Sequence, residues 1–398
     1  MTILSSRAKS LKPSPTLAIN AKAKSMQARG IQDVSFGAGE PDFDTPDNIK
    51  KAAKKALDDG FKKYTPVGGI DELKDAIINK FKRDSQLTYK RSEILVSCGG
   101  KHSFYNLAQA IFDQGDEVIV PAPYWVSYPP MVSLAGGTPV IVETTEKNDF
   151  KITPEDLKKA ATPRTKALIL CSPSNPTGSA YTKKDLEKIA EIAISKNILV
   201  ISDENYEKIV YDNFEVKNIV ALSPALRDRT VIINGVSKTY AMTGWRIGYA
   251  IGPAEIIAAA AKIQSQSTSN AASMAQAAAL EAISGPQIEV GRMVREFKRR
   301  RDVIVARLDA LPGIHCLKPQ GAFYVFPNVS SLLGRTVHGK KLASPCDFAD
   351  YLLEEAKVAV VPGEDFGSQE HIRFSYATAL EDIEKGCKRI ADAVAKLH

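Results

Sequence analysis

Lys238 is the residue of this 398-residue chain whose neighbours best suit covalent chemistry. It lies in the run GVSKTYAMTGWRIGY, directly after Ser237 and eight residues before Arg246. A serine hydroxyl and a two-pronged guanidinium both suit a bound phosphate. In a dry site, neighbouring cations lower the pKa of a lysine amine and make it nucleophilic, as bond formation with an aldehyde requires. A lysine taken alone is more often simply solvated, so the inference depends on these neighbours.

Two adjacent glycines form a second candidate site. Gly99 and Gly100 open a predicted helix, whose free backbone N–H groups and dipole favour a phosphate. A plain turn is the alternative, and a glycine pair alone favours the turn. A Walker A loop is excluded, because Leu95 stands where that motif needs glycine and His102 stands where it needs serine or threonine.

Asp203 is a third candidate, because it directly follows the apolar run ILVIS and begins the run DENYE. Its position alone favours a helix cap. A partly buried carboxylate also needs a cationic partner, however, and a protonated pyridine nitrogen would supply one. Asp203 therefore stays open between a cap and a cofactor contact.

The elements that must position these residues repeat one unit from residue 93 to about 252: a β-rich run, turn residues and a segment of helical period. Such alternation predicts an α/β fold with a mostly parallel sheet. Most runs are continuously apolar, as expected of strands covered on both faces. They are EILVS (93–97), DEVIV (116–120), TPVIV (138–142), KALIL (166–170), ILVIS (198–202), TVIIN (230–234) and RIGYAIG (246–252).

The residues that follow these runs form one candidate set. Ligands of an open parallel sheet bind beyond the carboxyl ends of its strands, where all of these residues would meet. The set comprises Gly99, Gly100, Lys101, Tyr124, Trp125, Asn175, Asp203, Tyr206, Ser237 and Lys238.

A smaller domain is predicted after the repeating region. The chain exceeds the roughly 250–300 residues at which single cores stop growing. After about Gly285 the sequence predicts a long charged helix (288–311), a strand in GAFYVFP, a helix at 346–356, the segments AVVPG and HIRFSYA, and a closing helix from Glu381. We expect a large domain over 41–287, a smaller α+β domain over 288–398, and an N-terminal segment, 1–40, that packs with the smaller domain.

Composition limits the class of protein. The apolar fraction of 44% and charged fraction of 25% are average for globular proteins, and no uncharged apolar stretch is long enough to span a bilayer. The net charge of +7 is modest, and the one dense basic run, 298–301, is too narrow for a nucleic-acid surface. The five cysteines share no C-x-x-C spacing and the five histidines are scattered. We therefore expect a cytoplasmic protein without metal, membrane or nucleic acid.

Six runs, in family order, resemble the class I, or fold-type I, aminotransferases that use pyridoxal 5′-phosphate (PLP). They are SFGAGEPDFDTP, KYTPVGG, SPSNPTG, SDENYE, SKTYAMTGWRIGY and HIRFSYA, and they cover essentially the full chain. The chain is most similar to the bacterial-type aspartate aminotransferases, some of which also act on prephenate. The resemblance implies a seven-stranded, mostly parallel sheet sandwiched by helices, a smaller α+β domain, PLP as cofactor and a homodimer with shared active sites.

The resemblance also implies a role for each matching residue. Lys238 would hold PLP covalently and transfer a proton, and Asp203 would pair with the pyridine nitrogen. Asn175 and Tyr206 would contact the phenolic oxygen, Trp125 would stack on the ring beside the substrate, and Gly100, Lys101, Ser237 and Arg246 would hold the phosphate, joined by Tyr64 from the second subunit. Arg373 would bind the substrate α-carboxylate, assisted by Gly39 and Asn175.

A dicarboxylic substrate needs a second cation. In the resembling subgroup the distal carboxylate is bound at the positions of Lys12 and Lys101, with Ser14 and Thr16 as nearby donors. Lys12 considered alone is equally well interpreted as a mobile N-terminal lysine.

Two positions depart from the family pattern. His102 stands where glutamine is usual, in the first turn of the helix after the glycines, and Asn205 stands where an apolar residue is usual. Asn205 adjoins Asp203, so we expect it to add a polar contact there.

The favoured activity is transfer of the amino group from aspartate to 2-oxoglutarate, with prephenate as a further substrate. Two alternatives stay open. One is a different PLP enzyme of the same fold: an aromatic or alanine aminotransferase, a lyase or a synthase. The other is a non-catalytic binding protein that keeps the fold, against which the intact set of Lys238, Asp203 and Arg246 argues.

Overall fold

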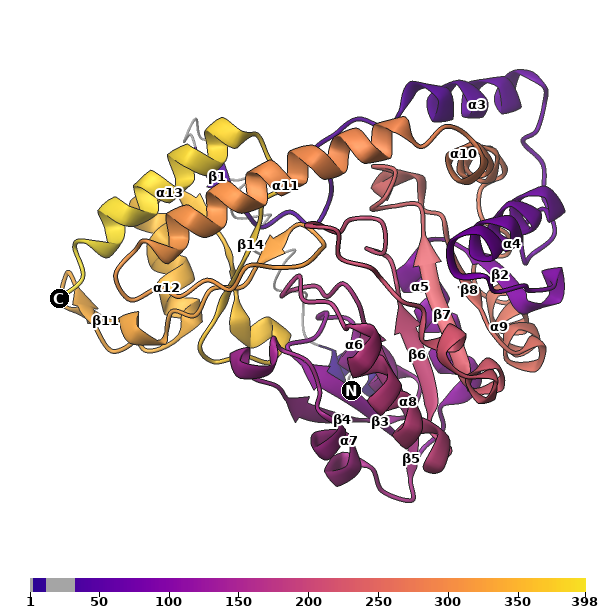
Figure 1. Ribbon diagram of the computed structural model, residues 1–398, viewed down its shortest axis with the longest axis horizontal. Helices are drawn as coiled ribbons and strands as arrows, with labels where there is room; N and C mark the ends of the chain where they lie inside the picture. Colours follow the sequence, from indigo (N-terminus) through magenta and orange to yellow (C-terminus); the bar gives the residue numbers. More distant parts are fainter. Residues whose placement is uncertain (1–2, 12–32) are drawn as a thin grey trace.

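The computed structural model describes residues 3–11 and 33–398. Figure 1 shows a wide central sheet surrounded by helices, with the C-terminal elements gathered beside it as a smaller group. The first described element is a short helix, α1 (Ser6–Ser10). Within the described ranges, no helix is long and apolar enough to cross a membrane.

The central sheet has seven strands in the order β2-β8-β7-β6-β5-β3-β4. All of its pairs are parallel except those of β8, which is antiparallel to both β2 and β7. The bounds are β2 (Ile94–Ser97), β3 (Glu117–Ala122), β4 (Thr138–Glu143), β5 (Thr165–Cys171), β6 (Leu199–Asp203), β7 (Thr230–Gly235) and β8 (Gly248–Ile251). Each predicted run contributes one strand, so the predicted α/β sheet is confirmed.

Helices cover both faces of this sheet, which explains the continuous apolar runs. Adjacent strand residues point to opposite faces, so Leu95 and Val96 belong to two separate buried clusters. Burying each such side chain contributes about 1.5–3 kcal/mol. The Leu95 cluster is completed by α5 (Gly100–Ile111), α6 (Tyr128–Leu134) and α9 (Ala254–Ser265). The Val96 cluster is completed by α3 (Asp47–Asp58), α4 (Asp71–Ser85), α7 (Pro154–Ala160), α8 (Lys183–Ser195) and α10 (Ser273–Ser284).

The C-terminal group combines helices with a small antiparallel sheet of order β13-β14-β9. Its elements are α11 (Ile288–Asp309), β9 (Tyr324–Val325), β10 (Thr336–Val337), β11 (Lys340–Lys341), α12 (Pro345–Tyr351), β12 (Val358–Ala359), β13 (Val361–Pro362), β14 (Ile372–Ser375) and α13 (Leu380–Val394). Strand β1 (Val34–Ser35) pairs in parallel with β12, and Phe36 packs on Phe374 with ring centroids 5.5 Å apart. These contacts join residues 34–36 to the C-terminal group, while the domain limits at 40 and 287 stay a prediction.

Several elements are shorter than the sequence pattern predicts. The strand expected at 246–252 begins only at Gly248, because Arg246 follows a 3₁₀ turn and has a left-handed backbone with φ of 56°. The strand expected in GAFYVFP is confined to β9. The helix expected at 346–356 becomes a π-helical turn at Leu352–Ala356. Each difference is a local backbone bend, which side-chain periodicity does not report.

An aromatic junction joins the C-terminal group to the large sheet. Phe326 and Phe366 share a buried cluster with Phe150, which follows β4. The ring of His371 stacks on Phe326 with centroids 4.9 Å apart, and its Nε2 lies 3.3 Å from Glu146 Oε1. Because His371 directly precedes β14, this junction fixes the strand that carries Arg373, a predicted site residue in the motif HIRFSYA.

Gly248 provides a test of how the glycine pair is held. A Cβ at Gly248 would lie 2.2 Å from the backbone N of Gly100 and 2.4 Å from the carbonyl carbon of Gly99. Gly248→Ala is therefore expected to lower the free energy of unfolding by about 1–3 kcal/mol, since rigid backbone must move. Gly244→Ala is the matched control, because nothing lies within 4 Å of a Cβ there. Urea unfolding measures both variants, and equally small losses would contradict this close packing.

Candidate active site

The amine of Lys238 lies beyond the end of β7, on the side where the parallel strands end. Its Nζ donates a hydrogen bond of 2.5 Å to the carbonyl oxygen of Gly39, and it lies 6.0 Å from the ring centroids of Tyr206 and Phe323. Burial lowers the pKa of Lys238 to about 8. Glu40 opposes this shift, while the positive charges of Arg373 and others nearby add to it. With this pKa, roughly a tenth of the amine is unprotonated at pH 7, and that fraction can act as a nucleophile and a base.

The Asp203 carboxylate ends β6 and is buried. Its Oδ2 accepts a 2.6 Å hydrogen bond from the hydroxyl of Tyr128. Its Oδ1 accepts hydrogen bonds from the backbone N and the side-chain Nδ2 of Asn205, at 3.2 and 2.8 Å. Burial raises the pKa of Asp203 against the effect of these donors. No ion pair to Asp203 forms within the described ranges: its hydrogen-bond partners are neutral donors, and Lys238 acts on it through charge without contact.

Arg373 on β14 is the buried cation of the site, with 2% of its surface exposed. It donates to Asn175 Oδ1 at 3.1 Å and to the carbonyl oxygen of Gly37 at 2.7 Å. Its Nε is buried and has no hydrogen-bond partner among residues 3–11 and 33–398. The Tyr324 ring lies 4.8 Å from the guanidinium, and the Tyr324 hydroxyl lies 2.8 Å from that of Tyr206. A guanidinium with an unsatisfied N–H is suited to a carboxylate.

The predicted phosphate site is built around Gly99, which precedes α5 with φ of 93°. A Cβ there would lie 2.4 Å from Arg246 Nη2, so the guanidinium packs directly on this turn. Arg246 itself donates to the carbonyl oxygens of Thr243 and Cys98, at 2.8 and 3.3 Å. Ser237 is buried directly before Lys238. These groups leave the first N–H groups of α5 beside a cation, an arrangement that favours an anion.

Lys101 and Trp125 meet at the same end of the sheet. The Lys101 Nζ lies 5.0 Å from the Trp125 ring, and Trp125 packs edge-on against Tyr128 with centroids 5.2 Å apart. Burial, together with the charge of Arg246, lowers the pKa of Lys101. Contacts thus run without a break from Lys101 through Trp125 and Tyr128 to Asp203.

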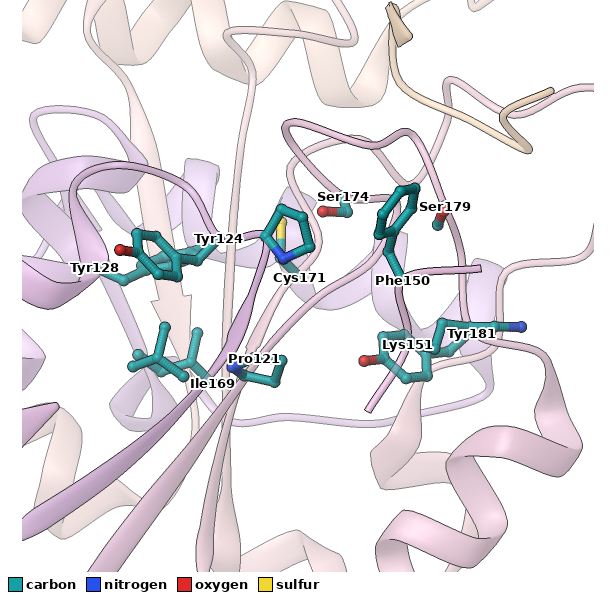
Figure 2. Close-up of a pocket in the computed structure, with 12 residues that line it drawn as sticks. Pro121, Tyr124, Tyr128, Phe150, Lys151, Ile169, Cys171, Ser174, Ser179 and Tyr181 are labelled. Carbon is teal, nitrogen blue, oxygen red and sulfur yellow. The ribbon is translucent and has the colours of Figure 1, made fainter. Parts of the chain in front are cut away.

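A small pocket adjoins this network and is lined in part by Tyr128. Figure 2 shows Tyr124 and Tyr128 on one side of this pocket, Phe150 on the other, and Cys171 and Ser174 between them in the view. Its lining includes the ends of β3 and β5 and Tyr128, whose hydroxyl donates to Asp203. Lys238, Arg246 and Arg373 do not line it. The pocket therefore borders the candidate site without containing its charged groups.

One predicted residue in the described part of the chain, Tyr64, lies apart from this network. The Tyr64 side chain is 92% exposed, so within one chain it contacts none of the groups above. Lys12, like Ser14 and Thr16, lies outside the described residues. Whether either reaches the site stays a prediction.

Most of the remaining predicted residues follow the carboxyl ends of β2, β3, β5, β6 and β7. Arg246 precedes the antiparallel strand β8, Arg373 lies on β14, and Gly39, after β1, accepts the hydrogen bond from Lys238. His102 lies in the first turn of α5, where its Nδ1 accepts a 3.2 Å hydrogen bond from the backbone N of Cys98. Asn205 makes the polar contact to Asp203 that the sequence predicts.

Three groups of the site were not predicted from the sequence. Tyr128 contacts Asp203, Tyr324 contacts Tyr206, and the Glu40 carboxylate accepts a 2.7 Å hydrogen bond from Thr243 Oγ1. Tyr128 had a detectable signal, since it follows the β3 run in the same turn as Trp125. Tyr324 had none, because it comes from a separate sheet that only tertiary packing brings here.

Comparison with known proteins accounts for this geometry. The family described as aminotransferase class I and II matches residues 31–390. The chain belongs to this family. Among curated members it is 53% identical to the aspartate aminotransferase of Bacillus sp. (strain YM-2) over 98% of both chains. It is 51% identical to the aspartate/prephenate aminotransferase of Cereibacter sphaeroides, again over 98% of both.

The fold of this family member is also that of solved aminotransferases. A structure of the aspartate aminotransferase from Thermus thermophilus with maleate superposes with a TM-score of 0.92, at 45% identity, over 99% of this chain and 100% of the other. The confirmed seven-stranded sheet is thus shared with a known aspartate aminotransferase.

The pKa of Lys238 predicts how this amine affects stability. Between its folded pKa of about 8 and its ordinary value of 10.5, the unfolded protein binds more protons than the folded one. Stability of the cofactor-free protein should therefore rise with pH through this window. Lys238→Met should remove that rise and stabilise the protein at pH 7 by about 1–3 kcal/mol.

Urea unfolding of cofactor-free protein between pH 7 and 10.5 measures this effect. Lys54→Met, at an exposed position of α3, is the control for exchanging lysine for methionine. A Lys238→Met protein no more stable than the parent at pH 7 would contradict a desolvated amine.

Proposed function

We propose that the chain is a PLP-dependent aspartate aminotransferase that transfers the amino group of L-aspartate to 2-oxoglutarate, with prephenate as a further acceptor. The observation that carries the proposal is one connected site with a desolvated lysine amine, a buried carboxylate without a cationic contact and a buried arginine with a free N–H. The identity of about 50% to aspartate aminotransferases over nearly the whole chain supports the same activity.

The described residues fit PLP. A pyridine nitrogen that carries a proton would give Asp203 the cation that the protein itself does not place in contact with it. A phosphate would occupy the turn at Gly99 and Gly100, beside Arg246 and Ser237. Trp125 would lie against the ring, and Asn175 and Tyr206 would donate to its phenolic oxygen. When bound, PLP supplies an electron sink that makes a substrate Cα–H acidic.

The protein's own part in the reaction is to orient the substrate and to move one proton. Arg373 would bind the α-carboxylate through two parallel N–H bonds, one of them from its unsatisfied Nε, with Asn175 and Gly39 beside it. The Nζ of Lys238 would then accept the Cα proton, because its pKa of about 8 keeps part of the amine unprotonated near neutral pH. Rigid positioning of these groups supplies the remaining rate enhancement.

A dicarboxylic substrate is favoured by two lines of support. Lys101 offers a second cation beside Trp125, and Lys12, Ser14 and Thr16 match the positions that serve the distal carboxylate in the resembling subgroup. The related Thermus thermophilus enzyme was solved with maleate, a dicarboxylate.

We further propose a cytoplasmic homodimer with shared sites. Tyr64 is 92% exposed, although large aromatic side chains are usually at least partly buried. It would become buried if it reached the phosphate site of a second subunit. All five cysteines are free thiols, which suits a reducing compartment.

Purified protein loaded with PLP is expected to convert aspartate to oxaloacetate once per active site without an acceptor, and continuously when 2-oxoglutarate is added. Lys238→Ala should lower kcat by at least about 10²–10⁴-fold, since it removes the group that moves the proton. Stopped-flow absorbance and product assays measure both reactions. Borohydride treatment of the parent should attach the cofactor at Lys238. Ammonia release without an acceptor would instead identify a lyase.

Lys12→Ala tests the choice of substrate. Losing one cation from the distal carboxylate should lower kcat/KM for aspartate and glutamate by about 10- to 100-fold and leave alanine and phenylalanine unchanged. Steady-state kinetics with this donor panel measures the effect, and Lys9→Ala, at a neighbouring position of the same segment, is the control. Equal losses for monocarboxylic and dicarboxylic donors would refute the role.

A further inference from the structure

Asn205 occupies a central place in the site without belonging to the predicted cofactor contacts. Its side-chain Nδ2 donates to Asp203 Oδ1 at 2.8 Å, in addition to the 3.2 Å bond from its own backbone N. A Cβ at Gly100 would lie 2.9 Å from the same Nδ2, and a Cβ at Gly235 would lie 3.3 Å from its Oδ1. The amide therefore fits between the ends of β6 and β7 and the first residue of α5.

We propose that Asn205 is a positioning residue whose amide holds Asp203 ionised and oriented toward the cofactor's ring nitrogen. This inference rests on the proposed function, since it assigns Asp203 to that nitrogen. An apolar residue in place of Asn205, as in the family pattern, would leave the carboxylate without this donor.

The hydrogen bonds of the carboxylate explain why one amide matters. A carboxylate has about four acceptor sites. Asn205 fills two of them on Oδ1, and Tyr128 fills one on Oδ2. One acceptor site on Oδ2 remains for a cationic partner. The bound donors fix the plane of the carboxylate and thus the direction of this remaining site. Only the Nδ2 bond depends on the side chain of residue 205, because the backbone bond survives substitution.

The charge state of Asp203 depends on the same bond. Burial disfavours the ionised carboxylate, and each donor to it restores part of the balance. Removing Nδ2 should therefore make Asp203 harder to ionise and weaken its attraction for a protonated nitrogen. Within the described residues, the other titratable groups that act on Asp203 are Tyr128 of α6, Cys171 of β5 and Lys238 after β7. Asn205→Ala alters none of these three.

The experiment is a double-mutant cycle on PLP affinity. Cofactor-free forms of the parent, Asn205→Ala, Asp203→Asn and the double variant are titrated with PLP, and the dissociation constants are measured by equilibrium dialysis. Asn205→Ala is expected to raise Kd about 10-fold, as loss of one hydrogen bond to a charged group does. In the Asp203→Asn background the same change should raise Kd less than about 2-fold.

The control separates positioning from folding. Asn218→Ala removes another buried amide, which donates to Glu204 at 2.9 and 3.0 Å and does not contact Asp203. It should lower the melting temperature while PLP Kd stays within about 2-fold of the parent. Asn205→Leu, which keeps the number and branching of the side-chain heavy atoms, serves if Asn205→Ala does not fold.

A second measurement determines the PLP Kd as a function of pH. A merely structural role of Asn205 would not change this pH dependence. The acid limb, where Asp203 loses its charge, should lie about one pH unit higher in Asn205→Ala than in the parent, since a tenfold effect corresponds to one unit. Equal losses of affinity in both backgrounds, or an unmoved acid limb, would overturn the proposal. If Asp203→Asn itself leaves Kd unchanged, the pairing of Asp203 with the cofactor fails, and the proposed function fails at that point.

Discussion

Desolvation of charge is the constraint on which the rest of this site depends. Lys238, Asp203 and Arg373 each lose hydration, and burial is the largest influence on the pKa of all three. A buried ion without a contacting counter-ion costs several kcal/mol, which the remaining fold must supply. The protein meets this cost in part with neutral donors and acceptors, such as the carbonyl of Gly39 for the amine and the hydroxyl of Tyr128 for the carboxylate. Such a site favours ligands that bring opposite charges to these buried groups.

The central sheet supplies both the free energy and the rigidity that such a site requires. The strands β6 and β7 are buried on both faces, so the carboxyl ends that carry Asp203 and the segment to Lys238 cannot shift independently. Arg373 comes from a different sheet, and its position depends on the aromatic junction around Phe326 and on the bond to Asn175. The proposed substrate end of the site therefore depends on packing between two sheets, whereas the proposed cofactor end depends on one.

This division explains how much could be predicted from the sequence. Strands covered on both faces give continuous apolar runs, and residues after such runs converge by topology, so the sheet and the places of Asp203 and Lys238 followed from pattern. The roles of Arg373 and Gly39 came from the resemblance to a family, because no local signal links β14 to the large sheet. The left-handed backbone of Arg246 and the contact of Tyr324 with Tyr206 come from tertiary packing, to which periodicity is blind. The proposed contact of Tyr64 with a phosphate would need a second chain, and one sequence cannot place it.

The neighbouring acids Asp203 and Glu204 are both buried carboxyl groups, but their hydrogen-bond surroundings suit them to different roles. Both are buried, and burial raises the pKa of both, that of Glu204 to about 8. Glu204 is enclosed by the hydroxyl of Ser202 and the amide of Asn218, which bonds to both of its oxygens. The donors of Asp203 leave an acceptor site on Oδ2. Glu204 can be protonated where it lies, whereas a protonated Asp203 could not attract a cation. Additional hydrogen-bond donors that favour the ionised carboxylate therefore matter only at Asp203. The amide of Asn205 stands at that position, next to the first residue of the helix that would receive the phosphate.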